Sequence, residues 1–187
     1  MNFCSNCGDT VRLRTPAGDD RPRYLCESCG TVHYENPKVV VGCIPEMDGK
    51  ILLCRRAIEP RAGKWTLPAG YLENGETVAQ GARRETFEEA GARIEILAPY
   101  ALFNICYVNQ VYLMFRARMV DANIKAGNES SEVRFFSERD IPWDQIAFTV
   151  IEETLRQYFK DKPAGLFPFH IGNILLKTEV NAWELDG

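Results

Sequence analysis

Apolar residues from position 38 onward form short runs separated by turn residues, and most of these runs have the length and composition of β-strands. Residues 39–44 are rich in β-branched side chains, and residues 51–56 follow them after Asp48-Gly49, a dipeptide typical of hairpin turns. Five further strands are expected at 65–67, 94–97, 102–108, 111–119 and 133–136. The pattern predicts a sheet built from many short strands.

Two segments have helical spacing instead. Residues 77–90 begin with Thr77, a good N-cap residue, and Gln80 completes a capping box with it. Gly91 then supplies a C-terminal stop. Residues 148–160 carry apolar side chains at the spacing of an amphipathic helix. Strands interspersed with helices predict an α/β domain in which the helices pack against a mixed sheet.

The first 37 residues follow neither pattern, because they hold few large apolar side chains and could hardly fold by burial alone. They contain two Cys-x2-Cys pairs, formed by Cys4, Cys7, Cys26 and Cys29. This spacing is typical of two knuckles that present four thiolates to one zinc ion, and the metal would supply the missing stability. Two disulfides or a redox pair are the alternatives. A site of four thiolates has no open position, so we expect a structural zinc ion.

Asn36-Pro37 separates this small module from the rest of the chain, because a residue before proline favours an extended or turn conformation. We therefore expect a zinc ribbon with its linker at 1–37 and a larger domain at 38–187. The basic and acidic residues of the ribbon cancel, which favours a scaffold or subunit contact over binding to nucleic acid.

Bulk composition agrees with a globular protein that acts on a small molecule. Hydrophobic residues make up 45% and charged residues 26% of the 187 residues, and the net charge is -4. No apolar run approaches the roughly 20 residues needed to cross a bilayer. The N-terminus lacks the pattern of a signal peptide, so we expect a cytoplasmic protein with no membrane or nucleic-acid partner. Cys43, Cys54 and Cys106 are expected to be small buried hydrophobic residues.

The helix at 77–90 carries the candidate chemistry. Glu85, Glu88 and Glu89 fall within an arc of about 100° on one helical face. Like charges at this spacing repel one another, and a divalent cation would reverse that cost. Oxygen ligands in this number suit Mg²⁺ or Mn²⁺. Arg84 can pair either with Glu88 or with Glu76. Taken alone, the three glutamates would be better explained as a solvated acidic surface.

The wider pattern changes that interpretation. Gly70, Glu76, Arg84-Glu85-Thr86-x-Glu88-Glu89 and Gly91-Ala92 stand at the spacing G-x5-E-x7-R-E-U-x-E-E-x-G-U, in which U is a bulky aliphatic residue. The segment thus resembles the Nudix box, with Thr86 and Ala92 as departures at the two aliphatic positions. The resemblance implies a Nudix α/β/α sandwich with a mixed sheet, preceded by a zinc ribbon.

The resemblance also implies roles for individual residues. Glu85 and Glu89 would be the main magnesium ligands, with Glu88 assisting and a backbone carbonyl near Gly70 adding one more. Glu76 and Arg84 would orient the ligand helix. The general base would come from a loop outside the box, where the candidates are Glu129 and Glu132, although this loop is almost equally compatible with a solvated surface.

Residues that select the substrate are less clearly indicated. Arg55, Arg56 and Arg61 are candidates for binding phosphate. Three aromatic residues in strands are candidates for stacking on a flavin or adenine ring, although aromatic strand residues more often belong to the core: Phe103, Tyr107 and Tyr112. The sequence indicates no role for His33 or His170.

The four-cysteine ribbon followed by Tyr34-x-Asn36-Pro37 and Trp65-Thr66-Leu67-Pro68 is similar to the branch of FAD and ADP-ribose pyrophosphatases. The signature of NADH pyrophosphatases is absent, since residues 98–103 stand in its place. The resemblance implies magnesium-dependent hydrolysis of FAD or ADP-ribose, a nucleotide substrate and a possible homodimer. An NADH pyrophosphatase, a nucleoside triphosphate pyrophosphohydrolase and a nucleotide-sensing regulator are the alternatives.

Overall fold

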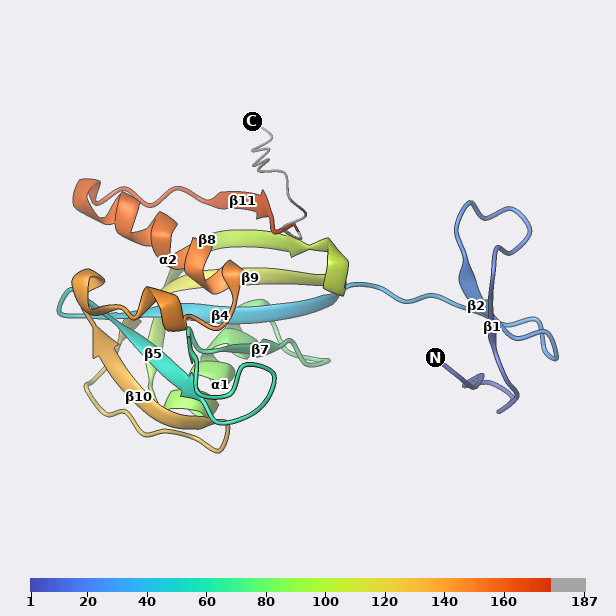
Figure 1. Cartoon of the computed structure of the whole chain (residues 1–187), viewed down its shortest axis with the longest axis horizontal. Helices are drawn as coiled ribbons and strands as arrows, with labels where there is room; N and C mark the ends of the chain where they lie inside the picture. The colour runs from blue at the N-terminus through green and yellow to red at the C-terminus, as the bar shows by residue number, and fades with distance from the viewer. Residues whose placement is uncertain (176–187) are drawn as a thin grey trace. The chain divides into compact units, whose positions relative to one another are not determined.

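The computed structural model describes residues 1–175, and the chain divides into two compact units, Met1–Pro37 and a second unit that begins at Lys38 (Figure 1). The first unit contains a three-stranded antiparallel sheet in the order β1-β2-β3, formed by Arg12–Arg14, Arg23–Leu25 and Val32–His33. Phe3 and Thr10 form an isolated antiparallel bridge that closes the N-terminal cysteine knuckle.

The second unit is built on one mixed sheet in the order β10-β5-β4-β9-β8-β11, with β6 paired to β5 and β7 paired to β4. The pairs β4–β9 and β8–β11 are parallel, and the other strand pairs are antiparallel. The strands are β4 (Lys38–Met47), β5 (Lys50–Arg56), β6 (Trp65–Thr66), β7 (Ala69–Tyr71), β8 (Ile94–Ile105), β9 (Gln110–Met119), β10 (Ser130–Phe136) and β11 (His170–Asn173).

Two helices accompany this sheet, α1 (Val78–Ala90) and α2 (Thr149–Asp161). Four short 3-10 helices lie in the connections: η1 (Cys106–Val108), η2 (Glu138–Asp140), η3 (Trp143–Gln145) and η4 (Lys162–Ala164). In the part of the chain that the structure describes, no helix is long and apolar enough to span a lipid bilayer.

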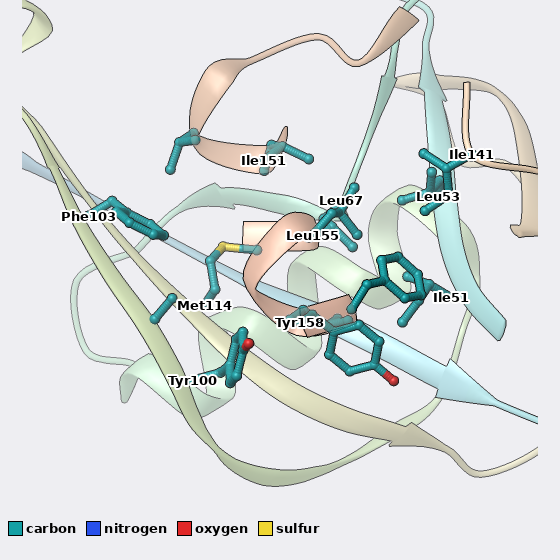
Figure 2. Packing of buried hydrophobic residues seen from close by; sticks show 14 of the residues in the cluster. Ile51, Leu53, Leu67, Tyr100, Phe103, Met114, Ile141, Ile151, Leu155 and Tyr158 are labelled. Carbon is teal, nitrogen blue, oxygen red and sulfur yellow. The ribbon is translucent and has the colours of Figure 1, made fainter. Parts of the chain in front are cut away.

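Alternation along the strands explains why the sheet has a helix on each face. On β5, Ile51 and Leu53 belong to one core cluster, whereas Leu52 and Cys54 belong to the other. Successive side chains of a strand point to opposite faces, so each face acquires its own apolar layer. The first layer packs against α2 through Ile151, Leu155 and Tyr158 (Figure 2). The second contains small residues of α1, which allow the helix to approach the sheet closely. The predicted mixed sheet with packed helices is confirmed.

The ends of α1 follow the sequence prediction closely. The Thr77 hydroxyl accepts a hydrogen bond from the Gln80 backbone N–H, and the Gln80 side chain accepts one from the Thr77 N–H. Gly91 ends the helix in the left-handed conformation, with φ of 61°. The capping box and the glycine stop are therefore confirmed.

Several sequence predictions about the second unit were wrong. The two strands expected at 94–97 and 102–108 form one strand, β8, which contains register shifts around Pro99 because proline cannot donate to the ladder. Its expected last residues form η1 instead. Cys106 was expected to be buried, but it is exposed because it lies in η1, beyond the end of the strand. Strands β7 and β11 were not predicted.

Strand β11, which no local pattern predicted, pairs in parallel with β8 at one edge of the sheet. Its position is fixed by His170, whose Nε2 lies 2.7 Å from Oδ2 of Asp161 in α2. The Tyr100 hydroxyl donates to the same oxygen at 2.7 Å. His170 therefore has a structural role that the sequence did not reveal, which is to connect the edge strand to α2.

Candidate active site

A cavity of about 1090 Å³ opens in the second unit, over the N-terminal half of the box segment and the exposed side of α1. This volume is slightly above the usual range for small-molecule sites, about 300–1,000 Å³. Its walls come from β4, β5, β7, β8, β9, η1, the loop before β6, the loop before β10 and the start of α2. The predicted site residues that line it are Arg56, Arg61, Gly70, Arg84, Glu85, Glu88, Glu89, Tyr107, Tyr112 and Glu129.

Glu89 is the most buried carboxylate of this cavity, with 7% of the residue exposed. Its Oε2 atom is buried and has no hydrogen-bond partner. Burial raises the pKa of Glu89 to about 8, and the charge of Glu85 adds to the shift. Burial also raises the pKa of Glu85. A buried carboxylate without a partner is costly, so this site is suited to a ligand that supplies positive charge.

Arg84 connects the glutamates of this region. Its guanidinium lies 2.7 Å from Glu76, 2.7 Å from Glu85 and 3.1 Å from Glu88, and it also donates to the Tyr71 carbonyl at 3.0 Å. The hydrogen bond from Arg84, followed by one from the Glu73 backbone N–H, lowers the pKa of Glu76 to about 2. Both pairings considered from the sequence are therefore present, and they hold the box loop against α1.

Gly70 allows the backbone of the box loop to approach these carboxylates. A Cβ at this position would lie 2.3 Å from the carboxyl carbon of Glu85, which is closer than atoms can pack. The backbone around Gly70 therefore lies directly against Glu85. The partnerless Glu89 oxygen and this close backbone approach fit a hard divalent cation with oxygen ligands, as Mg²⁺ or Mn²⁺ requires.

The two candidates for the general base lie in different places. Glu129 lines the cavity, and its charge raises the pKa values of Glu85 and Glu89. Glu132 lies opposite Arg55 in the β10–β5 register and pairs with it at 3.6 Å, outside the residues that line the cavity. The strand ladder directs Glu132 to Arg55, so this geometry favours Glu129 over Glu132 as the general base.

The two arginines predicted to bind substrate, Arg55 and Arg56, differ in position, because only Arg56 lines the cavity. Arg55 donates from Nε to the Gly63 carbonyl at 2.9 Å and is not part of the cavity wall, so its position gives no support to the predicted role in substrate binding. Arg56 lines the cavity, and its Nε donates to the Pro60 carbonyl at 2.9 Å. The Arg56 guanidinium lies over the Phe148 ring at 5.1 Å, and its charge opposes the raised pKa of Glu89. Its position favours contact with an anionic ligand.

Phe103 does not contact the cavity. It is buried in the core that packs against α2 (Figure 2). Gly172 of β11 lies beside its ring. Because β11 covers this position, the structure gives no support to the predicted contact of Phe103 with substrate. Two further aromatic residues line the cavity with Tyr107 and Tyr112, although no sequence pattern indicated them: Tyr71 and Phe148. Burial, and next the nearby Tyr71, raises the pKa of Tyr112 to about 12.

The four cysteines of the first unit come together as the spacing predicts. Their Sγ atoms all lie within 4.8 Å of one another, with Cys4–Cys29 at 3.7 Å and Cys7–Cys26 at 3.5 Å. Tetrahedral zinc with Zn–S bonds of about 2.3 Å places its sulfurs about 3.8 Å apart. Nε2 of His33 lies 3.3 Å from the Cys4 sulfur. The arrangement fits one zinc ion and is too open for disulfides.

Comparison with protein families gives two matches that together cover most of the chain. A family model described as NUDIX domain matches residues 36–157, and a zinc-ribbon model described as Nudix N-terminal matches residues 2–35. A crystal structure of a NUDIX hydrolase from Nitrosomonas europaea is 53% identical, with a TM-score of 0.88, and the match covers 93% of this chain and 100% of that one.

Curated relatives are more distant. An ADP-ribose pyrophosphatase of Methanocaldococcus jannaschii is 30% identical over 133 residues, which are 69% of this chain and 77% of that protein. The NAD-capped RNA hydrolase NudC of Vibrio atlanticus is 28% identical over 145 residues, which are 76% of this chain. This chain spans about half of that relative, 51% of its length.

Proposed function

The chain belongs to the Nudix family of hydrolases, and we propose that it hydrolyses the diphosphate bond of a nucleoside diphosphate linked to a second group, with FAD and ADP-ribose as the preferred substrates. The products would be AMP together with FMN or ribose phosphate. The observation that carries this proposal is the cavity that contains Glu85 and the buried Glu89, whose Oε2 atom has no hydrogen-bond partner. A bound divalent cation would offset this concentration of negative charge and would allow the anionic diphosphate of a substrate to lie beside it.

The carboxylates fit a divalent cation, which when bound neutralises negative charge on a diphosphate and lowers the pKa of a coordinated water molecule. Glu85 and Glu89 would be its principal ligands, with the more exposed Glu88 and the backbone near Gly70 assisting. Arg84 holds the box loop and helix together, so that these ligands keep their spacing.

Other residues of the cavity would act on the substrate and on the attacking water. Arg56 is held by the Pro60 carbonyl and the Phe148 ring, and makes no ion pair within the described residues. It would therefore contact a phosphate oxygen. Glu129 faces the same carboxylates and would accept the proton of the water that attacks phosphorus.

The aromatic residues that line the cavity favour a substrate with at least one planar ring. Tyr71, Tyr107, Tyr112 and Phe148 all line the cavity, and each could stack on an adenine or a flavin. FAD and ADP-ribose share an adenosine diphosphate half, so a cavity that binds this half would accept both. The likeness to an ADP-ribose pyrophosphatase supports the same substrate class.

A second candidate substrate is NAD, either free or as the cap of an RNA, whose diphosphate bond would be hydrolysed. It is favoured by several relatives named NAD-capped RNA hydrolase NudC. A regulator that only senses nucleotides is the alternative of another class, but a purely binding protein would have no need of the complete set of box carboxylates.

A direct comparison of substrates tests the proposal. Initial rates of AMP release would be measured for FAD, ADP-ribose and NADH, together with loss of cap from NAD-capped RNA and pyrophosphate release from dGTP, under identical magnesium. We expect kcat/KM for FAD or ADP-ribose to exceed that for the others by about tenfold or more, the scale of one favourable contact. A higher value for NADH, capped RNA or dGTP would overturn the substrate assignment and leave the hydrolase assignment intact.

A further inference from the structure

The loop between β9 and β10 is attached to the C-terminal end of α1 through its backbone. The Lys125 N–H donates to the Ala90 carbonyl at 2.7 Å, and the Gly127 N–H donates to the Glu89 carbonyl at 3.0 Å. The last carbonyl groups of a helix have no partner within the helix, so the loop satisfies two of them. This attachment fixes the loop to the helix that carries the box glutamates.

Gly127 approaches α1 more closely than any other residue type could. A Cβ at this position would lie 1.7 Å from the carbonyl oxygen of Glu88 and 2.9 Å from its carbonyl carbon. Both atoms belong to the helix backbone, which cannot turn aside as the end of a flexible side chain can. Any side chain at position 127 would therefore move the loop away from α1.

The residue that this movement would displace is Glu129. It follows Gly127 by two positions, lines the cavity and acts electrostatically on Glu85 and Glu89. Its carbonyl accepts a hydrogen bond from the Ala57 N–H at 2.8 Å, so the loop is held between α1 and the end of β5. The distance between Glu129 and the box carboxylates therefore depends on the contact at Gly127.

We propose that Gly127 is a positioning residue for hydrolysis, and that its lack of a side chain holds Glu129 at the working distance from the carboxylates of α1. The inference rests on the proposed function, in which Glu129 accepts the proton of the attacking water. A displacement on the order of 1 Å at such a group can cost roughly 100-fold in rate.

The test is a double-mutant cycle on the full chain, with Gly127→Ala, Glu129→Gln and the variant that carries both. We expect Gly127→Ala to lower kcat on the best substrate by about 10- to 100-fold, with KM and the magnesium dependence changed by no more than about threefold. We expect Glu129→Gln to lower kcat by about 100-fold or more, and addition of Gly127→Ala to reduce it no further.

Three measurements separate positioning from general damage. Lys125→Ala is the matched control, because it keeps the backbone bond to Ala90 and should retain the wild-type kcat. Glu129→Asp withdraws the carboxylate without touching the contact with α1, and should reproduce the loss caused by Gly127→Ala. Thermal unfolding of each variant shows whether the fold is intact.

The outcomes distinguish the inference from the proposed function. A wild-type kcat in folded Gly127→Ala would overturn the inference alone. So would an equal fall in kcat when Gly127→Ala is added to the wild type and when it is added to Glu129→Gln. If Gly127→Ala does not fold, a wild-type kcat for Glu129→Asp would overturn it. Absence of diphosphate hydrolysis by the wild-type chain would overturn the proposed function, and the inference with it.

Discussion

Glu89 is buried, and its Oε2 atom has no hydrogen-bond partner among the described residues. Glu89→Gln keeps the size of the side chain and removes a negative charge that a cation would require. We expect kcat at saturating magnesium to fall by at least about 100-fold, and each tenfold loss corresponds to about 1.4 kcal/mol of barrier. The side chain of Glu88 is 57% exposed, so Glu88→Gln should lose less. Glu138 is exposed and lies outside the cavity wall, so Glu138→Gln is the matched control and should leave kcat unchanged. A near-normal rate for Glu89→Gln would contradict its role as a ligand.

The raised pKa of Glu89 also predicts how pH affects the stability of the magnesium-free protein. Because the folded-state pKa is about 8 and the ordinary value is 4.5, the folded state binds this proton more tightly than the unfolded state. The resulting stability is fully present below pH 4.5 and is lost as the pH rises through 8. We therefore expect the Tm of the wild type, relative to Glu89→Gln, to fall between pH 5 and pH 8.

Differential scanning fluorimetry in magnesium-free buffer without a chelator would measure this difference and leave the zinc module undisturbed. Added magnesium should raise the Tm of the wild type at pH 8 and have little effect on Glu89→Gln. Parallel Tm curves for the two proteins across this range would show that the Glu89 carboxylate is not destabilised by burial.

Residue by residue, the sequence predicted the box carboxylates correctly as neighbours on one helix, because helical spacing alone decides which side chains share a face. It could not distinguish Arg56 from Arg55. These residues are adjacent on β5, and successive strand residues point to opposite faces, so the choice depends on the register of the sheet. The burial of Phe103 could not be predicted, because β11, which covers it, has no recognisable sequence pattern of its own.

At the scale of elements, α1 was the easiest to predict because its caps are local interactions between residues close in sequence. Strand β8 was harder, because Pro99 interrupts the apolar pattern and only the long pairing with β9 keeps the strand continuous. Pairing between distant segments is a tertiary effect that local patterns do not contain.

The capping box of α1 gives a prediction at this scale. Thr77→Ala removes the hydroxyl that accepts the Gln80 N–H, and should lower the free energy of unfolding by about 1 kcal/mol. Thr77→Ser keeps the acceptor and serves as the matched control. Urea denaturation of both variants at constant zinc and magnesium would measure the difference. Equal stabilities for the two variants would show that the hydroxyl does not stabilise the helix.

For the whole molecule, the division into two compact units predicts that loss of zinc affects one unit before the other. Purified protein should contain about one zinc ion per chain, and Cys26→Ser should lose it and unfold the ribbon. Every residue that lines the cavity lies in the second unit. Because changes at distant sites that share no contacts have largely independent effects, the kcat of Cys26→Ser should remain within about threefold of the wild type.

Elemental analysis of freshly purified, unchelated protein would measure the zinc content. Amide NMR spectra would report separately on whether residues 1–37 are folded. Cys43→Ser changes a buried cysteine outside the ribbon and should keep the zinc. Protein that is folded in the ribbon but free of zinc would contradict the assignment of a structural metal.

The attachment of β11 to β8 limits how far this protein can be shortened from its C-terminal side. The family match ends at residue 157, but Ile174 lines the cavity and is held by the Asn104 carbonyl at 2.8 Å. A chain cut after Gly165 would retain every box residue and yet lose this wall and the cover over Phe103. We expect such a chain to melt at a lower temperature and to have a higher KM. A shortened form of this protein should therefore keep the chain through Ile174.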